Sequence, residues 1–423
     1  MPLSVKPQIA SSPWNSYVNP YTGQGMSKSN LSPRLFTPSF IALTFSSFCV
    51  MSTMYFLMAT MVGYAAAEFG AGSSAAGLTS GIFIFGGCFG RIIAGRALER
   101  FGERGPAAVS FALFVLSAGA YFLASSLMSL LIIRLIHGVC FGVTATILAG
   151  AAMRTVPAAR RGEGSGWFST GTSLATGVAP FVGMLLASMK NGYQIQFAVS
   201  TGIAAAATIL ALGCWKHLSV AEPRNKVSTE HGINKWVAPK ALPIALVISC
   251  CSAPYGFLLS FLQPYSEQRG LEGPARWYFV VYAIVILLSR PIGGVMQDCR
   301  GDDVVIIPTL VCFTCGYLLS ANATSGLTLL IGAGLLGLGY GTGISACQAT
   351  AVAKTAQRRA GMAVSSYYLL VDLATGVGPF IIGGLVSILG YHLTFSVAGF
   401  LALVGLALYL TWARGIPDAK NVL

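Results

Sequence analysis

The sequence predicts an all-α membrane protein in which twelve transmembrane helices form two pseudo-symmetric six-helix bundles. Three observations lead to this fold class: an apolar composition, an internal repeat and twelve long apolar runs. Of the 423 residues, 55% are hydrophobic and only 9% are charged, whereas a soluble domain carries roughly 25% charged residues. So few charges cannot cover a surface in contact with water, and lipid must therefore surround most of the chain.

The internal repeat has a fixed offset of 199 residues. The segment Leu174–Phe181 returns as Leu373–Phe380. Two further regions keep the same offset, one around Arg91 and one around Gly138. Separate regions that share one offset indicate duplication of a whole half, because chance matches would not keep a common spacing. Two copies of so long a unit do not suggest a solenoid.

The twelve apolar runs come close to the length of about 20 residues that a helix needs to cross a bilayer. Six precede and six follow a polar stretch in the middle of the chain. The expected spans are 36–65, 74–96, 106–126, 128–152, 165–188, 195–214, 241–265, 276–297, 304–321, 326–352, 361–388 and 392–413.

The polar segments divide the chain into two bundles, 36–214 and 241–414, joined by a cytosolic linker at 215–240. Residues 1–35 are rich in Ser, Pro and Asn and lack the apolar core and cleavage site of a signal peptide. We expect them to form a disordered cytosolic tail, with a second short cytosolic tail at 415–423.

The positive charges set the expected orientation. With both ends of the chain in the cytosol, the Lys and Arg residues fall in tails, cytosolic loops or span ends, apart from Arg134, Lys190, Arg269 and Arg276. This is the asymmetry of the positive-inside rule, and it places a formal net charge of +13 against anionic inner-leaflet lipid. We expect a multi-pass protein of the cell (inner or plasma) membrane with lipid partners and no nucleic-acid partner.

The cysteines indicate packing rather than chemistry. Most of the ten lie inside apolar runs, where a neutral thiol packs as a small apolar side chain. Cys312 and Cys315 have the spacing of a metal or redox motif but no His partners nearby. No metal site and no cofactor is expected.

Several motifs resemble those of the major facilitator superfamily. Gly95–Arg104, between the second and third spans, resembles its cytosolic loop motif, and 294–301 is a weaker copy. Arg134–Gly138 resembles its Arg-x-x-Gln/His-Gly motif in span four. Ala175–Gly183 and its copy Ala374–Gly384 resemble the span-five motif of the drug/proton antiporters (the DHA1-like branch).

The resemblance covers residues 38–414 and implies a secondary transporter that works by alternating access. It implies proton-coupled efflux, by antiport, of a small organic or amphiphilic compound, so that the partners are that substrate and protons; we expect a monomer. Spans one to six hold no carboxylate at membrane depth, unlike some multidrug exporters of the family, which disfavours lipophilic cations. An uptake symporter of the same fold and a non-transporting sensor or scaffold are alternatives. No nucleophile–base pair or phosphate loop indicates an enzyme.

Three ionisable side chains fall well inside predicted spans: Arg134, His137 and Asp372. A charge near the bilayer centre costs at least about 2.5 kcal/mol, so such residues usually line a cavity or pair with one another. Asp372 is the only acidic residue at such depth, where burial disfavours its ionised form, and we expect it to load and release protons. The permanently charged Arg134 is expected to organise hydrogen bonds in the first half, to attract an anionic substrate group or to bias the pKa of a nearby acid, and the resemblance implies a role in coupling. His137 is expected to pack and form hydrogen bonds near it, with a proton relay as the alternative.

The two copies of the loop motif are expected to form a cytosolic gate. A carboxylate in such a loop can meet a helix N-terminus or an Arg of the other half and hold one closed state. The resemblance implies that this gate stabilises the outward-facing state. Its residues are Arg91, Gly95, Glu99, Arg100, Gly102 and Arg104 in the first half and Arg290, Gly294, Asp298 and Gly301 in the second. For Arg91 and Arg290, which are placed near the cytosolic surface, membrane anchoring is the preferred interpretation and a part in the gate is the alternative.

Small residues and prolines on spans five and eleven are expected to form a tightly packed interface that seals while the halves move. They are Gly177, Pro180, Gly183, Gly376, Gly378, Pro379, Gly383 and Gly384. Aromatic and amide side chains on inner spans are expected to line a substrate cavity suited to an amphiphilic molecule. They are Tyr55, Phe56, Trp167, Tyr255, Phe257, Gln263, Gln348, Tyr367 and Tyr368.

Overall fold

The computed structural model describes residues 35–157, 160–215, 238–356 and 359–417. The expected N-terminal tail up to residue 34, most of the linker (216–237) and the last residues (418–423) lie outside the described residues. All secondary structure in the described residues is helical, and these residues contain no strand. The first half contains α1 (Pro38–Met58), α2 (Met61–Phe69), α3 (Ser73–Phe101), α4 (Arg104–Gly119), the 3-10 turn η1 (Ala120–Leu123), α5 (Leu127–Thr155), α6 (Arg161–Ala187) and α7 (Gly192–Trp215).

The second half repeats this order after the short 3-10 turn η4 (Pro239–Ala241). It contains α8 (Leu242–Arg269), α9 (Glu272–Arg300), α10 (Asp303–Ala321), α11 (Gly326–Leu336), the π-helical turn η5 (Gly337–Gly341), α12 (Thr342–Ala353), α13 (Ala360–Leu408) and the π-helical turn η7 (Tyr409–Ala413). α1 with α2, and α11 with η5 and α12, each make one interrupted span.

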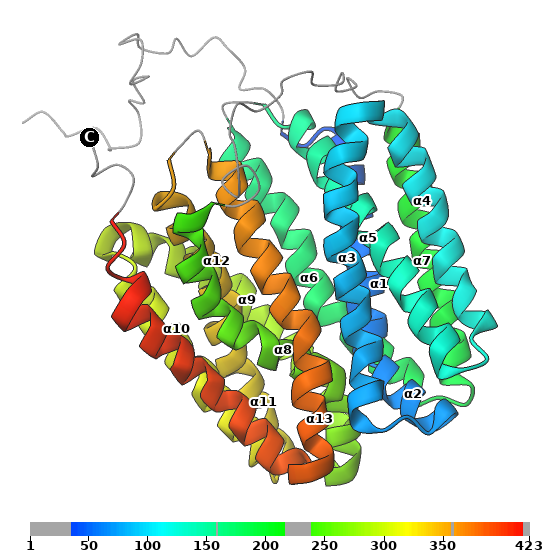
Figure 1. Cartoon of the computed structure of the whole chain (residues 1–423), viewed down its shortest axis with the longest axis vertical. Coiled ribbons are helices and arrows are strands. Elements are labelled where there is room, and N and C mark those ends of the chain that lie inside the picture. Colours follow the sequence, from blue (N-terminus) through cyan, green and yellow to red (C-terminus); the bar gives the residue numbers. More distant parts are fainter. Residues whose placement is uncertain (1–34, 158–159, 216–237, 357–358, 418–423) are drawn as a thin grey trace, which may run out of the picture.

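Eleven helical stretches of the described chain are long and apolar enough to cross a membrane. The last of them, Met362–Ala413, has 52 residues, and a straight helix of that length would extend about 78 Å, far more than a bilayer core of about 30 Å. It reverses direction at Gly390, whose φ of 70° is left-handed, as the orange and red segments show (Figure 1). The chain therefore makes the twelve expected crossings.

Local signals that begin and end helices recur at the offset of 199. Ser126 and Ser325 are related by the repeat, and each accepts a hydrogen bond from the backbone N–H three residues later. Such N-caps satisfy donors that the first helical turn leaves free. Gly102 (φ 69°) and Gly301 (φ 87°) follow α3 and α9 in a left-handed conformation that other residues rarely adopt.

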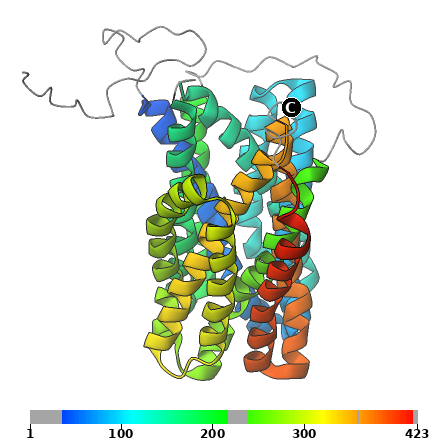
Figure 2. The same ribbon diagram turned by 90° about the vertical axis from the view of Figure 1, so that its left-hand side faces the viewer.

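The helices stand side by side, with the ends of the described segments at one end of the molecule and α2 at the other (Figures 1 and 2). We call the first the basic end, because the connections there from α3 to α4, α5 to α6, α9 to α10 and α12 to α13, together with the helix ends beside them, carry many Lys and Arg residues. The opposite end holds α2 and the turn at Gly390.

Contacts inside the two halves are repeated along with the sequence. A Cβ placed on Gly138 would lie 2.0 Å from the carbonyl oxygen of Phe83, and one on Gly337 would lie 2.6 Å from that of Tyr282. Both pairs obey the offset of 199. Glycine therefore lets α5 approach α3, and η5 approach α9, to backbone contact in each half.

The two halves pack tightly against each other toward the opposite end. A Cβ on Gly77 of α3 would lie 2.0 Å from the carbonyl oxygen of Pro379 in α13, and one on Gly81 would lie 2.2 Å from that of Gly376. In the repeat-related interface, a Cβ on Gly177 of α6 would lie 2.4 Å from the Cβ of Ala283 in α9. These small residues close the contact between the halves at that end.

Candidate functional site: a cavity between the halves

A cavity of about 320 Å³ lies between the two halves. Helices of both halves line it: α1, α3, α5 and α6 on one side, and α8, α9, η5, α12 and α13 on the other. Its polar lining consists of Arg91, Arg290, Asp372, Tyr55, Tyr255, Tyr282, Tyr340, Tyr368, Ser173, Thr172, Thr176 and Thr375. Met51, Met54 and Met58 of α1 supply flexible apolar surface.

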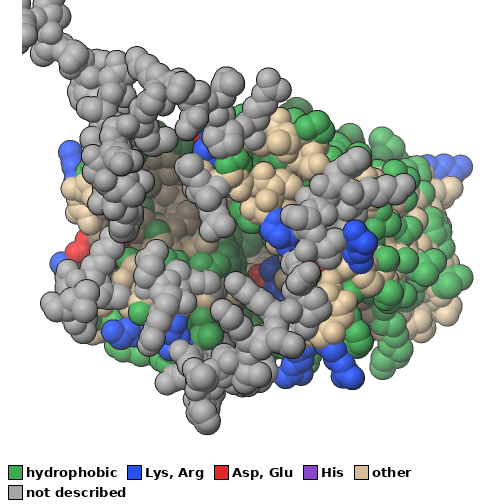
Figure 3. All heavy atoms as spheres, turned by 90° about the horizontal axis from the view of Figure 1, so that it is seen from above, with side chains coloured by type: hydrophobic (Ala, Val, Ile, Leu, Met, Phe, Trp, Pro, Cys, Tyr) green, Lys and Arg blue, Asp and Glu red, His purple; other side chains and the backbone are tan. Residues whose placement is uncertain are grey.

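The cavity continues toward the basic end through a second hollow. Thr172, Ser173, Arg290 and Tyr368 line both, and the outer one is bordered by Trp167 and other residues of α6, α9 and α12. The molecule seen from the basic end is hollowed between the halves, where grey atoms leave the surface visible (Figure 3). With the small-residue contacts at the opposite end, the cavity is open on one side and closed on the other.

An ion pair joins the two halves inside the cavity. Nε of Arg91, in the second half of α3, lies 3.2 Å from Oδ2 of Asp372 in α13. Both side chains are partly exposed to the cavity. An ion pair in such a partly desolvated site is screened less than a surface pair, so the charge of Asp372 directly affects how α3 and α13 are held together.

A second arginine faces the cavity without an acidic partner. Nη1 of Arg290 donates to Oγ of Ser173 at 2.6 Å, and Nε donates to the carbonyl oxygen of Gly341 at 3.2 Å. Ser173 in turn donates to the carbonyl oxygen of Ser169. Across the described chain, no carboxylate lies within ion-pair distance of Arg290. Its guanidinium is held by neutral groups alone.

The two arginine contacts are copies of each other. Arg91 and Arg290 are related by the offset of 199, and so are Ser173 and Asp372. In each case an arginine of one half meets the equivalent position on a helix of the other half. Duplication has therefore produced two equivalent sites, of which one has a carboxylate and the other a hydroxyl.

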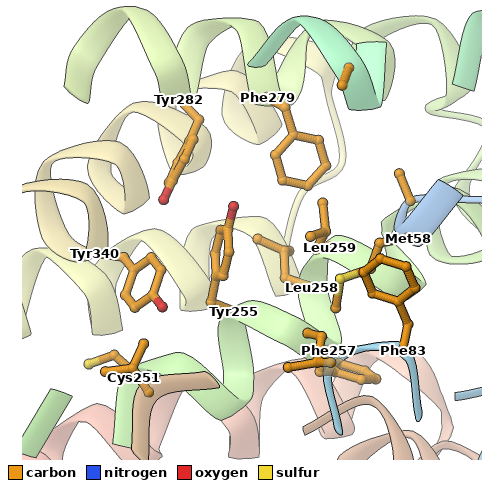
Figure 4. Packing of buried hydrophobic residues seen from close by; sticks show 14 of the residues in the cluster. Met58, Phe83, Cys251, Tyr255, Phe257, Leu258, Leu259, Phe279, Tyr282 and Tyr340 are labelled. Atoms are coloured by element: carbon orange, nitrogen blue, oxygen red, sulfur yellow. The ribbon is translucent and has the colours of Figure 1, made fainter. Parts of the chain in front are cut away.

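Three stacked tyrosines form one wall of the cavity. The ring of Tyr255 in α8 lies between those of Tyr340 and Tyr282, with centroid distances of 4.4 Å and 5.6 Å, as Figure 4 shows. The rings are nearly parallel, at 26° and 22°. This wall offers flat apolar surface with hydroxyl groups at its edge, which suits a small organic molecule with an aromatic or apolar part.

The sequence of the chain matches the profile of the Major Facilitator Superfamily over residues 43–276 and 273–422. These matches cover nearly all of the helical part. The chain belongs to the major facilitator superfamily. It is therefore a membrane transporter of the superfamily type, and its fold, repeat and central cavity agree with that assignment.

Relatives of similar length include two uncharacterized superfamily transporters. MJ1560 of Methanocaldococcus jannaschii is 23% identical over 380 residues, which cover 87% of this chain and 97% of that protein. PA14_38730 of Pseudomonas aeruginosa is 24% identical over 400 residues, covering 89% of this chain and 94% of that protein.

Solved structures share the fold at low identity. The nucleoside transporter NupG has a TM-score of 0.72 at 10% identity, covering 88% of this chain and 100% of that one. A bacterial homologue of the human lysosomal transporter Spinster, in an inward-facing and unoccupied conformation, has a TM-score of 0.72 at 15% identity, covering 91% and 98%.

Arg134 and His137 lie outside the cavity, in the interior of the first half. Arg134 is fully buried; its Nε donates to the carbonyl oxygen of Thr79 at 2.7 Å, Nη1 donates to Tyr121 Oη at 3.3 Å, and the guanidinium lies 4.5 Å from the ring centre of Phe83. His137 Nδ1 is 3.0 Å from the same Tyr121 hydroxyl. These contacts agree with a hydrogen-bond organiser, and neither side chain touches Asp372.

The expected cavity residues are only partly brought together. Tyr55, Tyr255 and Tyr368 line the cavity, and Trp167 and Gln348 line the outer hollow, where Gln348 accepts a hydrogen bond from Tyr368. The remaining four are elsewhere: Phe56 packs on Gly183, Phe257 is buried against Phe261 and Phe395, Tyr367 donates to the carbonyl oxygen of Ile344, and Gln263 contacts Glu267 near the opposite end.

Apart from Arg91 and Arg290, the described residues of the expected gate make no ion pair or hydrogen bond across the halves. Arg104 and Asp298 are exposed, Arg100 stacks on Phe101, and a Cβ on Gly95 or Gly294 would meet nothing within 4 Å; the side chain of Glu99 is outside the described part. Within this loop, Glu103 is buried and pairs with Arg154 of the same half.

Arg91 and Arg290 lie in the cavity rather than with these loop residues. The expectation placed them at the cytosolic surface because the loop motif follows closely. α3, however, continues to Phe101, so that Arg91 lies about 15 Å from the helix end. The offset of 199 could have revealed the pairing, since it relates the lone intramembrane acid to Ser173 and the two arginines to each other.

Proposed function

We propose that this chain is a proton-coupled secondary transporter of a small organic compound, in which Asp372 carries the proton. The observation that supports this most is the ion pair between Arg91 and Asp372, inside a cavity that is open at one end only. A carboxylate in this place controls an attraction between helices of opposite halves. A proton that neutralises it removes that attraction.

The cycle that we propose has two charge states. Ionised Asp372 holds α13 to α3 through Arg91; protonated Asp372 releases Arg91 and allows the halves to rock. Rocking would separate the small-residue contacts between α3 and α13 and between α6 and α9. The loop residues of the basic end, including Arg100, Arg104 and Asp298, would then meet and close that end.

The direction of transport has two candidates. The Gly–Pro motif shared with drug/proton antiporters supports export in exchange for protons, with the basic end facing the cytosol. The excess of arginine over carboxylate in the cavity instead supports co-transport with protons.

The test is proton flux in liposomes that contain a pH-sensitive dye. With a proton gradient imposed, small organic compounds are screened on the wild-type protein, on Asp372→Asn, and on Glu68→Gln as a control that removes an exposed acid outside the cavity. We expect compound-dependent flux in the wild type and the control and none in Asp372→Asn. Undiminished, pH-dependent flux in Asp372→Asn would exclude Asp372 as the proton carrier, and binding without flux would indicate a uniporter or a sensor.

A further inference from the structure

We infer that the substrate is a small organic anion whose carboxylate binds Arg290, opposite Ser173. The inference rests on the proposed function and specifies its substrate class. The two repeat-related sites in the cavity differ in the group that faces the arginine. Opposite Arg91 stands a carboxylate, and opposite Arg290 stands only the hydroxyl of Ser173.

Arg290 has hydrogen-bonding capacity to spare. Its two hydrogen bonds use Nε and one N–H of Nη1, so that three of the five guanidinium N–H groups are free. Its side chain lines both the cavity and the outer hollow. The carbonyl of Gly341 that fixes Nε ends the π-helical turn η5, a kind of irregularity frequent at functional sites. A guanidinium held in place at Nε and Nη1, with both N–H groups of Nη2 free, can donate charge-assisted hydrogen bonds to a carboxylate.

The charges that line the cavity favour an anion. Arg91 and Asp372 cancel, and Arg290 leaves one positive charge in excess. The groups near Asp372 are Arg91 and Cys88 of α3, Tyr55 of α1 and Tyr368 of α13, and Arg290 of α9 lines the same cavity. None of them is a second acid. An unpaired charge at membrane depth is costly, and an anionic substrate would reduce that cost.

The rest of the substrate has an apolar surface to pack on. Tyr282 and Tyr340, on either side of Tyr255, line the same cavity as Arg290. A volume of about 320 Å³ admits a molecule the size of a substituted benzoate, and one unpaired positive charge matches a single carboxylate. We therefore assign an aromatic or aliphatic monocarboxylate.

An anionic substrate determines whether protonation of Asp372 strengthens or weakens substrate binding. Protonation of Asp372 changes the charge of the cavity from about one positive unit to two, and it therefore strengthens the binding of an anion. By linkage, the anion then favours protonation of Asp372 to the same degree. Proton and substrate bind together and move in the same direction, which selects co-transport over exchange.

Equilibrium binding to the purified protein tests the inference. Binding is measured rather than flux, because the protonated form of a weak aromatic acid crosses bilayers unaided. Radiolabelled benzoate and phenylacetate are compared with their amides and with benzylamine, which differ mainly in charge. The variants are Arg290→Gln, Ser173→Asp and Ser173→Asn, with Lys190→Gln as a control that removes one exposed positive charge outside the cavity.

We expect the carboxylates to bind and neither the amides nor the amine to compete. Arg290→Gln should weaken binding about tenfold or more, since a hydrogen bond to a charged group is lost. Ser173→Asp should weaken it similarly by placing a competing carboxylate opposite Arg290, and Ser173→Asn, which adds the bulk without the charge, should weaken it less. Lys190→Gln should bind as the wild type does. Acidification should tighten binding in the wild type, and Asp372→Asn should bind tightly without pH dependence.

Amides or benzylamine that bind as well as the carboxylates would overturn the inference, and so would equal binding of benzoate by Ser173→Asp and by the wild type. If Arg290→Gln does not fold, Ser173→Asp still decides, because it keeps Arg290 in place. Arg290-dependent anion binding without proton flux would retain this site and reject proton coupling. Asp372-dependent flux driven by an amine would retain coupling and reject the anion.

Discussion

Arg134 shows how far the two halves have diverged at single residues. It contacts Thr79 and Tyr121 in the first half, and the offset of 199 relates these three positions to Ala333, Tyr278 and Ser320. In the second half the hydroxyls of Tyr278 and Ser320 are 2.8 Å apart, so that a neutral hydrogen bond occupies the equivalent place. The fold therefore does not require a charge at this position.

Replacement of Arg134 by Met should leave the protein folded and proton-coupled. The substitution keeps most of the volume, removes a buried cation that has no acidic partner among the described residues, and leaves Tyr121 bonded to His137. Arg134→Ala, which also empties the space, should lower the stability by about 2–5 kcal/mol. Thermal unfolding and liposome proton flux measure both effects. A stable Arg134→Met protein without coupling would assign Arg134 to the coupling machinery.

At the scale of elements, α3 connects closure of the cavity to its charge. Its first turns press Gly77 and Gly81 against α13, and almost three turns later it presents Arg91 to Asp372 on the same α13. The contacts that seal the opposite end and the ion pair in the cavity therefore join the same two helices. Movement of α3 against α13 would change both together.

Gly81→Ala should disfavour the conformation in which α3 and α13 are in contact at the opposite end. The new Cβ would lie 2.2 Å from the carbonyl oxygen of Gly376, and relief of such overpacking costs about 1–3 kcal/mol, equivalent to a change of about 5- to 150-fold in the ratio of two states. Spin-label distances across the opposite end should lengthen. The control is Gly95→Ala in the same helix, whose Cβ meets nothing within 4 Å. Equal distances in both variants would show that α3 and α13 do not separate.

At the scale of the whole molecule, the features that could be predicted from the sequence are those that depend on hydrophobicity and on the duplication. Twelve spans, two halves and the fold class followed from apolar runs and one constant offset. The break between α1 and α2 and the π-helical turn η5 did not, because both occur inside continuous apolar sequence without proline. Such irregularities depend on packing partners that are distant in the sequence.

The site was predictable only where a residue type is rare at membrane depth. Asp372 was identified because it is the lone acid there, and it lines the cavity. Aromatic residues are abundant in spans. The local sequence does not distinguish Tyr255, which lines the cavity, from Tyr367, which is buried and does not line it. Arg91 and Arg290 line the cavity, although the loop motif that follows them had placed them near the membrane surface. Helix length, rather than motif position, decides how far a side chain lies from the end of its helix.

The duplication leads to a prediction about the whole molecule: the carboxylate should function from the equivalent position in the other half. Asp372→Ser alone removes the acid and should abolish proton coupling. Added to it, Ser173→Asp would place a carboxylate opposite Arg290, whose Nη1 now lies 2.6 Å from Ser173 Oγ, and would leave Arg91 as the unpaired guanidinium. Proton flux in liposomes should then recover partly, above the level of Asp372→Ser.

The matched control for this exchange is Asp372→Ser with Ser173→Asn, which has the same bulk at 173 without the charge and should stay uncoupled. Recovery in the aspartate variant alone would mean that coupling follows from the pseudo-symmetric pairing of one carboxylate with one arginine across the halves. A folded double variant no more active than Asp372→Ser would contradict this. Coupling would then depend on groups found only around Asp372, such as Tyr55 and Tyr368, whose places in the other half are taken by Pro254 and Ser169.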